Sequence, residues 1–254
     1  MATQSTDLRT RFYPQSRYGG FTDQDQGIIF YLRVNALLRP EHRVLDVGCG
    51  RGKASEDTVD VRRELSSLRG RCARVIGIDV DPDAAENPTL DEFHLLDPAK
   101  PWPLPDASVD MVVSNFVLEH VADPALFFSE VRRVLRPGGK LCMRTTNVFS
   151  YFGVLARVVP GRYHAKVVRT AYARDAREER DVFPTVYRCN TVWKLRRMLS
   201  RHGFSHYVYG YQAEPAHFGF SRLLYRFGVA HQRHAPHFVK PTLFVFAERA
   251  AEAG

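Results

Sequence analysis

Short apolar runs alternate with amphipathic stretches along the first 150 residues of the chain. The apolar runs are rich in valine and isoleucine, as buried strands are, and the stretches between them repeat apolar residues at helical spacing. Strands that alternate with helices predict a parallel sheet with crossover helices. Residues 43–50 predict a short strand that runs into a glycine turn, and the further predicted strands are Arg74–Asp81, Asp91–Asp97, Val109–Phe116 and Gly139–Thr146. The predicted helices are Lys53–Gly70 and Asp123–Gly139.

The pattern changes after Thr146. Residues 147–190 are basic and aromatic without a strand rhythm, and loops of that length are usually functional or disordered. We predict that they form a mobile lid over a substrate. Residues 190–204 predict a helix capped by Asn190 and stopped by Gly203. The segments 204–211 and 240–249 predict two last strands, with an insertion at 212–240 between them.

These elements predict one α/β domain over residues 1–254. Its fold class is a Rossmann-like seven-stranded, mostly parallel sheet with helices on both faces. A lid insertion follows the fifth strand, and a second insertion separates the sixth and seventh strands. Within the domain we expect a ligand-binding core at about 43–147, a lid and substrate insertion at 148–190, and the last helix and strands at 191–254.

Composition narrows the class of protein. The 254 residues are 44% hydrophobic, which is enough for one large core, and no run of 18 apolar residues predicts a membrane-spanning helix. The polar N-terminus does not resemble a signal peptide. The four cysteines are widely spaced and form no CxxC, so we expect reduced thiols in a cytoplasmic protein.

Charge is distributed unevenly along the chain. Residues 1–139 hold 17 Lys and Arg against 21 Asp and Glu, a net charge of −4, and residues 140–254 hold 19 against 7, a net charge of +12. This asymmetry indicates either a basic half that faces an acidic partner or an ordinary solvated surface.

A glycine turn follows the first predicted strand, in the sequence VLDVGCGRG. Gly48, Gly50 and Gly52 have GxGxG spacing, whereas a dinucleotide site needs GxGxxG. The carboxylate of Asp46 would also repel a pyrophosphate. It suits a positively charged ligand such as S-adenosylmethionine, which carries a sulfonium and an ammonium group. The pattern therefore disfavours a nicotinamide oxidoreductase.

Polar residues also stand at the ends of the next strands. Asp79 ends the second strand, where a carboxylate can accept hydrogen bonds from both hydroxyls of a ribose. Asp97 ends the third, where it can accept from the amine of an adenine. Residues 114–116 end the fourth, at the rim where a reacting group must lie.

With these motifs in place, the chain resembles a class I S-adenosylmethionine-dependent methyltransferase of the bacterial small-molecule type. The matching segments are VLDVGCGRG, VIGIDVDP, LLDPAKPWPLPDASVDMVVSNFVLEHVADP and LRPGGKLCMRTTN, in the expected order over residues 43–147. The tail from Glu178 to Phe204 resembles the lid and following helix of these enzymes. One departure is the gap of 31 positions from Gly48 to Asp79, which predicts an extended first crossover helix.

The resemblance implies a role for each matching residue in binding S-adenosylmethionine and its product, S-adenosylhomocysteine. The turn frames the methionine end, the second strand holds the ribose, the third holds the adenine, and the fourth closes over the methionine. In that order the residues are Asp46, Gly48, Cys49, Gly50 and Gly52, then Asp79 and Val80, then Leu96 and Asp97, then Asn115 and Phe116. Cys49 is interpreted as a small filler of the turn.

The acceptor side is less well defined. A hydroxyl or ammonium acceptor must lose a proton, which calls for a base. His120 is the first candidate for the catalytic base, with a purely structural histidine as the alternative, and His164 is the second. Glu119 faces either substrate or solvent. Candidate substrate residues are Asn147, Tyr151, Tyr187 and Arg188.

Three partners compete for the basic, aromatic residues after Thr146. We expect an anionic or sugar-like small molecule first, and peripheral membrane contact through YFGVLARVV and SRLLYRFGVAH second. Nucleic acid is disfavoured, because residues 114–117 read Ser-Asn-Phe-Val where base methyltransferases carry an Asn/Asp-Pro-Pro-aromatic turn. The histidines in HQRHAPH predict a basic surface and no metal, because Pro236 interrupts the helix and no carboxylate is near. The oligomeric state stays open.

The sequence thus predicts an enzyme that transfers a methyl group from S-adenosylmethionine to a small metabolite or glycan, on oxygen. One alternative is N- or C-methylation of a natural product or a lipid-like acceptor. An alternative of another class is a non-catalytic protein that binds S-adenosylmethionine or a partner.

Overall fold

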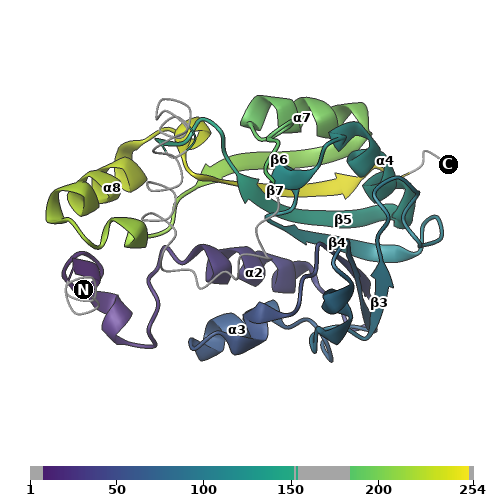
Figure 1. The fold of residues 1–254 in the computed structure, drawn as a ribbon, viewed down its shortest axis with the longest axis horizontal. Helices are drawn as coiled ribbons and strands as arrows, with labels where there is room; N and C mark the ends of the chain where they lie inside the picture. Colours follow the sequence, from purple (N-terminus) through teal and green to yellow (C-terminus); the bar gives the residue numbers. More distant parts are fainter. Residues whose placement is uncertain (1–7, 152, 154–183, 252–254) are drawn as a thin grey trace. The chain divides into compact units, whose positions relative to one another are not determined.

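The computed structural model describes residues 8–151, 153 and 184–251. Seven strands form one sheet in the order β3-β2-β1-β4-β5-β7-β6 (Figure 1). The pairs from β3 to β5 are parallel, and β7 runs opposite to β6. The predicted seven-stranded, mostly parallel sheet is confirmed. The strands are β1 (Arg43–Val47), β2 (Arg74–Asp79), β3 (Glu92–Leu95), β4 (Val109–Asn115), β5 (Leu135–Thr146), β6 (Phe204–Tyr211) and β7 (Thr242–Arg249).

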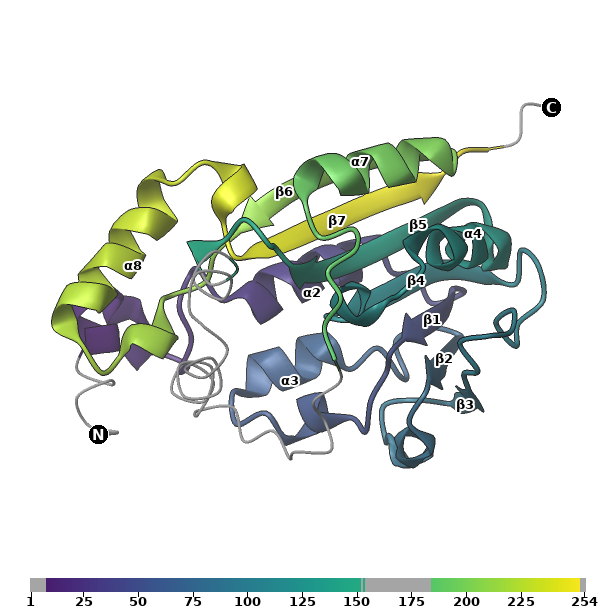
Figure 2. The ribbon, with the colours of Figure 1, turned by 45° about the horizontal axis from the view of Figure 1, so that its top comes forward.

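Helices cover both faces of the sheet. In Figures 1 and 2, α2 (Gln26–Leu37) and α3 (Asp60–Ser66) lie on one face, and α4 (Pro124–Val134) and α7 (Val192–Arg201) on the other. The helix α8 (Arg222–His234) belongs to the segment between β6 and β7. Short 3-10 turns complete the fold: η1 (Pro14–Arg17), η2 (Lys53–Glu56), η3 (Pro82–Glu86), η4 (Leu118–His120), η6 (Ala216–Phe218) and η7 (His237–Val239).

The chain divides into two compact units, each with its own core. The sheet unit comprises Gly27–Thr146, Thr185–Tyr209 and Leu243–Gly254, and its core lies between the sheet and its helices. The α8 unit comprises Met1–Gln26, Asn147–Pro184 and Gly210–Thr242. Its core is a smaller cluster of Leu8, Tyr13, Tyr225 and Val229. A single domain with boundaries at 147 and 190 stays a prediction.

The helix α4 follows its sequence signals closely. Asp123 caps it by accepting hydrogen bonds from the backbone N–H groups of Ala125 and Leu126. Its apolar residues recur at helical spacing and are buried against the sheet: Phe127, Phe128, Val131 and Val134.

The predicted start of the fifth strand at Gly139 is wrong. Leu135 already pairs with Val109, and the next regular pair joins Lys140 to Met111. The residues between them therefore form an irregularity inside β5, where Gly138 has φ +78°. Glycine there lets the strand absorb extra residues and resume its register.

Two helix predictions also need correction. The first crossover helix is short, because Asp57 accepts a hydrogen bond from the N–H of Val59 and holds the backbone in a turn before α3 begins. The cap of α7 is Thr191, which accepts from the N–H of Lys194. Asn190 is fully buried and donates to the hydroxyl of Thr145.

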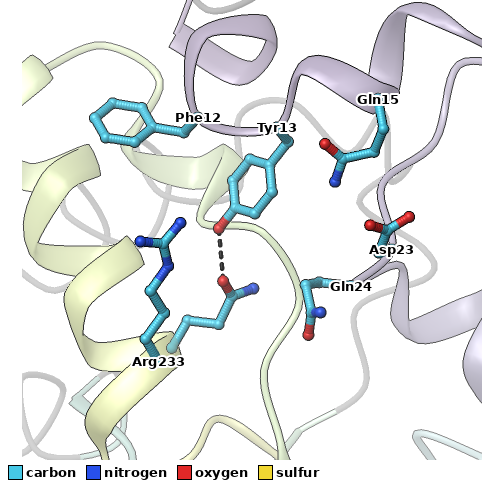
Figure 3. Close-up of a pocket in the computed structure, with 7 residues that line it drawn as sticks. Phe12, Tyr13, Gln15, Asp23, Gln24 and Arg233 are labelled. Atoms are coloured by element: carbon cyan, nitrogen blue, oxygen red, sulfur yellow. Dashed lines mark hydrogen bonds between the residues drawn. The ribbon is translucent and has the colours of Figure 1, made fainter.

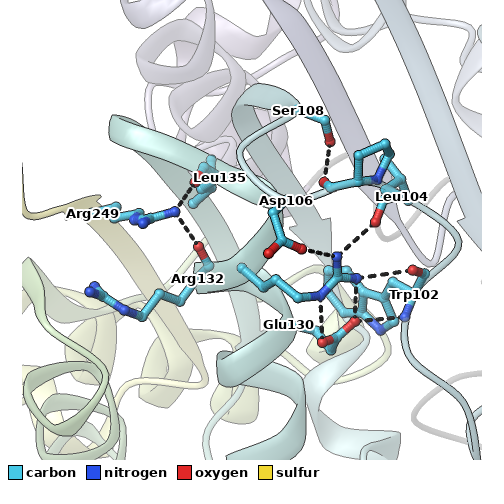
Figure 4. A network of polar contacts seen from close by, with 10 residues as sticks. Trp102, Leu104, Asp106, Ser108, Glu130, Arg132, Leu135 and Arg249 are labelled. Atoms are coloured by element: carbon cyan, nitrogen blue, oxygen red, sulfur yellow. Dashed lines mark hydrogen bonds and ion pairs between the residues drawn. The ribbon is translucent and has the colours of Figure 1, made fainter.

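One arginine ties the loop between β3 and β4 to α4 (Figure 4). The guanidinium of Arg133 donates to both carboxylate oxygens of Glu130 and to the backbone oxygens of Trp102 and Leu104, and it pairs with Asp106. Glu130 is buried and also accepts from the N–H of Trp102. All five guanidinium N–H donors thus have acceptors, which fixes the loop on the way to β4.

Candidate functional site

Three glycines follow β1, and each has a positive φ: +70° at Gly48, +53° at Gly50 and +79° at Gly52. A Cβ on Gly48 would lie 2.2 Å from Val117, and one on Gly52 would lie 2.5 Å from Asn87. A Cβ on Gly50 would meet no protein atom within 4 Å. Two glycines are therefore required by packing as well as by conformation, whereas Gly50 borders open space.

Two side chains hold this turn, one at the end of β2 and one in the segment that follows it. Asp79 accepts hydrogen bonds from the N–H of Gly50 at 2.8 Å and of Asp81 at 2.9 Å. The amide of Asn87 donates to the oxygens of Cys49 at 3.0 Å and of Gly50 at 2.9 Å. Sequence reasoning missed Asn87, whose only signal is its position before Pro88 in the turn after the second strand.

Asp46 lies near the end of β1 and is partly exposed. Protein atoms replace most of the water around its carboxyl group, and together with the nearby charge of Asp79 they raise the pKa of Asp46 to about 7. Burial also raises the pKa of Tyr31 to about 12, with a smaller contribution from Asp46. Two carboxyl groups in one corner favour a cation between them.

The rim of the site is formed by the ends of β4 and β5. Phe116 has φ +57°, which is strained for a bulky residue, and its N–H donates to the oxygen of Arg144. The Arg144 guanidinium donates to Asn115 and lies 5.1 Å from the ring centres of both Phe116 and Phe30. Buried Arg144 thus fixes the two rim residues predicted from the sequence.

The residues predicted for ribose and adenine lie at the ends of β2 and β3. The N–H of Leu96 donates to the backbone oxygen of Asp79 at 2.7 Å. Val80 is 41% exposed, and Asp97 is exposed and pairs with Lys100 at 3.1 Å. The structure therefore gathers the predicted cofactor residues at the carboxyl end of the parallel strands.

Cys49 packs inside the turn. Its sulfur lies 2.8 Å from the position that a Cβ on Gly77 would occupy. Burial raises the pKa of its thiol well above the ordinary value, and Asp46 and Asp79 raise it further. A thiol held neutral is a poor nucleophile, which agrees with its interpretation as a filler.

His120 and Glu119 follow β4 in η4, and they have different surroundings. His120 is half-buried. Glu119 does not face solvent, because it is 4% exposed and accepts a hydrogen bond from the hydroxyl of Thr145 at 2.8 Å. Thr145 in turn accepts from Asn190 at 2.7 Å, so these side chains form a buried network.

The four candidate substrate residues have separate environments. The Asn147 side chain is buried and donates to the backbone oxygens of Phe238 and Lys240, which indicates a structural role. Tyr151 bonds to His217 at 2.9 Å within the α8 unit. Tyr187 and Arg188 are exposed in the sheet unit.

Much of the predicted lid, including His164, lies outside the described residues. Of the three histidines in HQRHAPH, His231 bonds through Nδ1 to Gln212 at 2.6 Å, and His237 bonds through Nδ1 to the oxygen of Gly210 at 2.9 Å. Both therefore have hydrogen-bond partners within the α8 unit.

The α8 unit contains a hollow of about 370 Å³ (Figure 3). Aromatic rings and polar side chains line it together, and the hydroxyl of Tyr13 bonds to Gln232 at 2.7 Å. The lining residues are Phe12, Tyr13, Gln15, Asp23, Gln24, Gln232 and Arg233. Sequence reasoning missed this hollow, because it joins segments about 200 residues apart.

The comparisons with known proteins concern part of the sheet unit. A family model described as a methyltransferase domain matches residues 45–143, which include the glycine turn, Asp79 and the rim residues Asn115 and Phe116. The match covers 99 of the 254 residues. The recognition made from the sequence is confirmed for this part of the chain.

The methyltransferase domain also has named relatives. The chain is 41% identical over 113 residues to an S-adenosylmethionine-dependent methyltransferase from Mycolicibacterium smegmatis, covering 42% of this chain and 39% of that protein. It is 32% identical over 109 residues to a malonyl-[acyl-carrier protein] O-methyltransferase from Serratia marcescens, covering 42% and 39%. The chain thus spans about two fifths of the length of these relatives.

A solved structure shows a similar fold. It is the complex between the Haloferax volcanii Trm112 methyltransferase activator and a methyltransferase, with a TM-score of 0.57 and 18% identity over 99% of this chain and 98% of that chain. At that identity the likeness concerns the fold alone. Within the part of the chain that the structure describes, no helix is both long and apolar enough to cross a membrane.

Proposed function

We propose that the chain is an S-adenosylmethionine-dependent methyltransferase that methylates oxygen on a small metabolite or glycan. The observation that carries this proposal is Gly50, a glycine at positive φ whose missing side chain opens onto space beside two carboxyl groups. A bare backbone next to Asp46 and Asp79 suits a ligand that has a cationic end and a ribose.

The residues fit this cofactor in chemistry as well as in position. Asp46 would hold the cationic methionine end, and Asp79 would accept from the ribose hydroxyls with the lone pairs that its two backbone N–H donors leave. Leu96 and Asp97 would hold the adenine, while Asn115 and Phe116 cover the methionine. The bound cofactor supplies a methyl group on a sulfonium, a strong electrophile.

The residues of the chain must then position the acceptor and accept the proton that it loses. Alignment alone can contribute about 7–11 kcal/mol to a bimolecular step. His120 is the base that we propose for a hydroxyl acceptor, because it is half-buried directly after the rim. A carboxylate acceptor would need no base.

The hollow in the α8 unit has the chemistry to bind a hydroxylated ligand, whatever its position relative to the sheet unit. Amide, carboxylate and guanidinium groups from Gln24, Asp23 and Arg233 can donate to and accept from hydroxyl groups, while the rings of Phe12 and Tyr13 offer flat apolar surface. The name of the Serratia relative, an O-methyltransferase, agrees with oxygen as the methylated atom. The net charge of +12 after residue 139 favours an anionic acceptor.

Calorimetry with S-adenosylmethionine, S-adenosylhomocysteine and NAD tests the cofactor. We expect binding of both adenosyl ligands and none of NAD. Binding of NAD alone would overturn the proposal. If the chain binds S-adenosylmethionine but methylates none of a broad panel of acceptors, a non-catalytic binding protein is favoured instead.

The acceptor is tested by saturation-transfer NMR with monosaccharides and oligosaccharides. Asp23→Ala should weaken the signal from sugar protons, whereas Glu41→Ala, an exposed acid in the sheet unit, should not. Methylation of amines or carbon acids, with no sugar or alcohol product, would favour the N- or C-methyltransferase alternative.

A further inference from the structure

The helix α8 has two apolar faces. One is buried in its own unit and contains Tyr225, Gly228 and Val229, beside the buried amide of Gln232. The other is exposed and carries Leu223 at 76% exposure, Leu224 at 38% and Phe227 at 51%. Phe220, at 53% exposure, lies just before the helix.

Leu223, Leu224 and Phe227 lie one and three positions apart, so they share one side of the helix, and Phe220 extends this surface before the N-cap Ser221. We call them the α8 stripe. Single exposed apolar residues are ordinary on protein surfaces, but a contiguous stripe of this size marks an interaction site. The opposite side of the helix packs against the core of its own unit, whereas within the stripe Phe227 contacts the rings of Tyr151 and His231 and stays 51% exposed.

Arginines border the α8 stripe. Arg222 and Arg226 alternate with its members along the helix and are exposed. Together with Arg11, Leu8 and Phe12, they line a second hollow of about 490 Å³. No acidic residue lines that hollow, and α8 itself contains three arginines and no acid.

We propose that the α8 stripe docks on an anionic phospholipid bilayer. The apolar side chains enter the boundary between headgroups and acyl chains, and Arg222 and Arg226 pair with lipid phosphates at the same level. An amphipathic helix with arginines beside large apolar residues lies in the plane of an interface in this way. The proposal concerns the α8 unit and does not depend on the proposed methyl transfer.

Charge and apolar surface together favour this partner over two others. A second copy of the chain, docked by twofold symmetry on the same face, would bring arginines against arginines. A nucleic acid would pair with the arginines but would leave the four apolar side chains in water. An anionic bilayer satisfies both groups.

The test is co-sedimentation of the full chain with vesicles of neutral phosphatidylcholine, and with vesicles that contain phosphatidylglycerol as well. We expect binding to the anionic vesicles that weakens with salt. Arg222→Gln and Arg226→Gln should each reduce the partition coefficient about fivefold. The double variant Leu223→Gln/Phe227→Gln should reduce it by more than tenfold.

Leu126→Gln is the matched control, because Leu126 is also an exposed leucine on a helix, at 46% exposure on α4. It should bind vesicles like the unmodified chain, and circular dichroism should show all variants folded. No sedimentation with anionic vesicles, or equal sedimentation of the stripe variants, overturns the proposal. A dimer in analytical ultracentrifugation that the stripe variants dissociate also overturns it, in favour of a second copy.

Discussion

The three glycines after β1 share a left-handed backbone conformation but differ in their surroundings. A Cβ on Gly48 or Gly52 would clash with a neighbouring side chain, whereas a Cβ on Gly50 would meet no protein atom within 4 Å. A substitution at the first two therefore tests packing, whereas one at Gly50 tests the ligand. This difference allows a mutation that separates binding from folding.

Gly50→Val should reduce the affinity for S-adenosylhomocysteine by more than tenfold, because the side chain enters the space beside Asp46 and Asp79. Gly70→Val is the matched control: Gly70 has φ +77° and also meets no atom within 4 Å. Both variants should lose similar stability from the left-handed backbone, about 1–2 kcal/mol or more. Calorimetry and thermal unfolding measure the two effects, and equal affinity loss in both variants would remove Gly50 from the site.

Asp46 should make stability depend on pH. Its folded pKa of about 7 is above its unfolded value, so the folded state keeps the proton that the unfolded state loses first. The contribution to stability is fully present below about pH 4 and is lost as pH rises through 7. In Asp46→Asn, the free energy of unfolding measured by denaturant titration should depend less on pH in this range. An unchanged dependence on pH would show that Asp46 does not titrate there.

The same carboxyl group should couple cofactor binding to proton release. A bound cation stabilises ionised Asp46, so below pH 7 the group must lose its proton when the cofactor binds. Calorimetry of S-adenosylmethionine binding at pH 6, in buffers with different ionisation enthalpies, should show about one proton released. The Asp46→Asn variant should release none, and equal release by both proteins would contradict the assignment.

At the scale of elements, the loop between β3 and β4 depends on α4. Arg133→Ala should destabilise the protein by about 3–5 kcal/mol, because it leaves buried Glu130 without its cation. The double variant Arg133→Leu/Glu130→Leu should recover part of that loss, since it removes the stranded charge. Urea unfolding measures both, and a loss below 1 kcal/mol would show that water replaces the guanidinium.

At the scale of the whole molecule, the two units have separate cores, so a ligand of the sheet unit need not stabilise both. S-adenosylhomocysteine should slow hydrogen exchange at the glycine turn, after β2 and at the rim, all in the sheet unit. Exchange in α8 should stay unchanged with this ligand alone. Peptide-resolved exchange measures this, and protection of α8 would show that the units are coupled.

The sequence by itself determined the order of the strands in the sheet unit and the polar residues at the carboxyl ends of the parallel strands, but it did not predict α2. The reason is local: valine-rich runs, the Asp123 cap and the glycines at 48, 50 and 52 act through their own backbone. Because parallel strands put their carboxyl ends on one edge, those motifs also predicted where the cofactor residues meet.

Only the tertiary structure decided which polar groups face one another. Asn87 clamps a turn 37 residues earlier, and Glu119 turns inward to Thr145, because leaving a buried amide or carboxylate unpaired costs free energy and the fold supplies these partners. The sequence likewise could not decide which side of α8 is exposed, because its two apolar faces look alike in sequence. Packing against Leu8 and Tyr13 buried one face and left the other exposed.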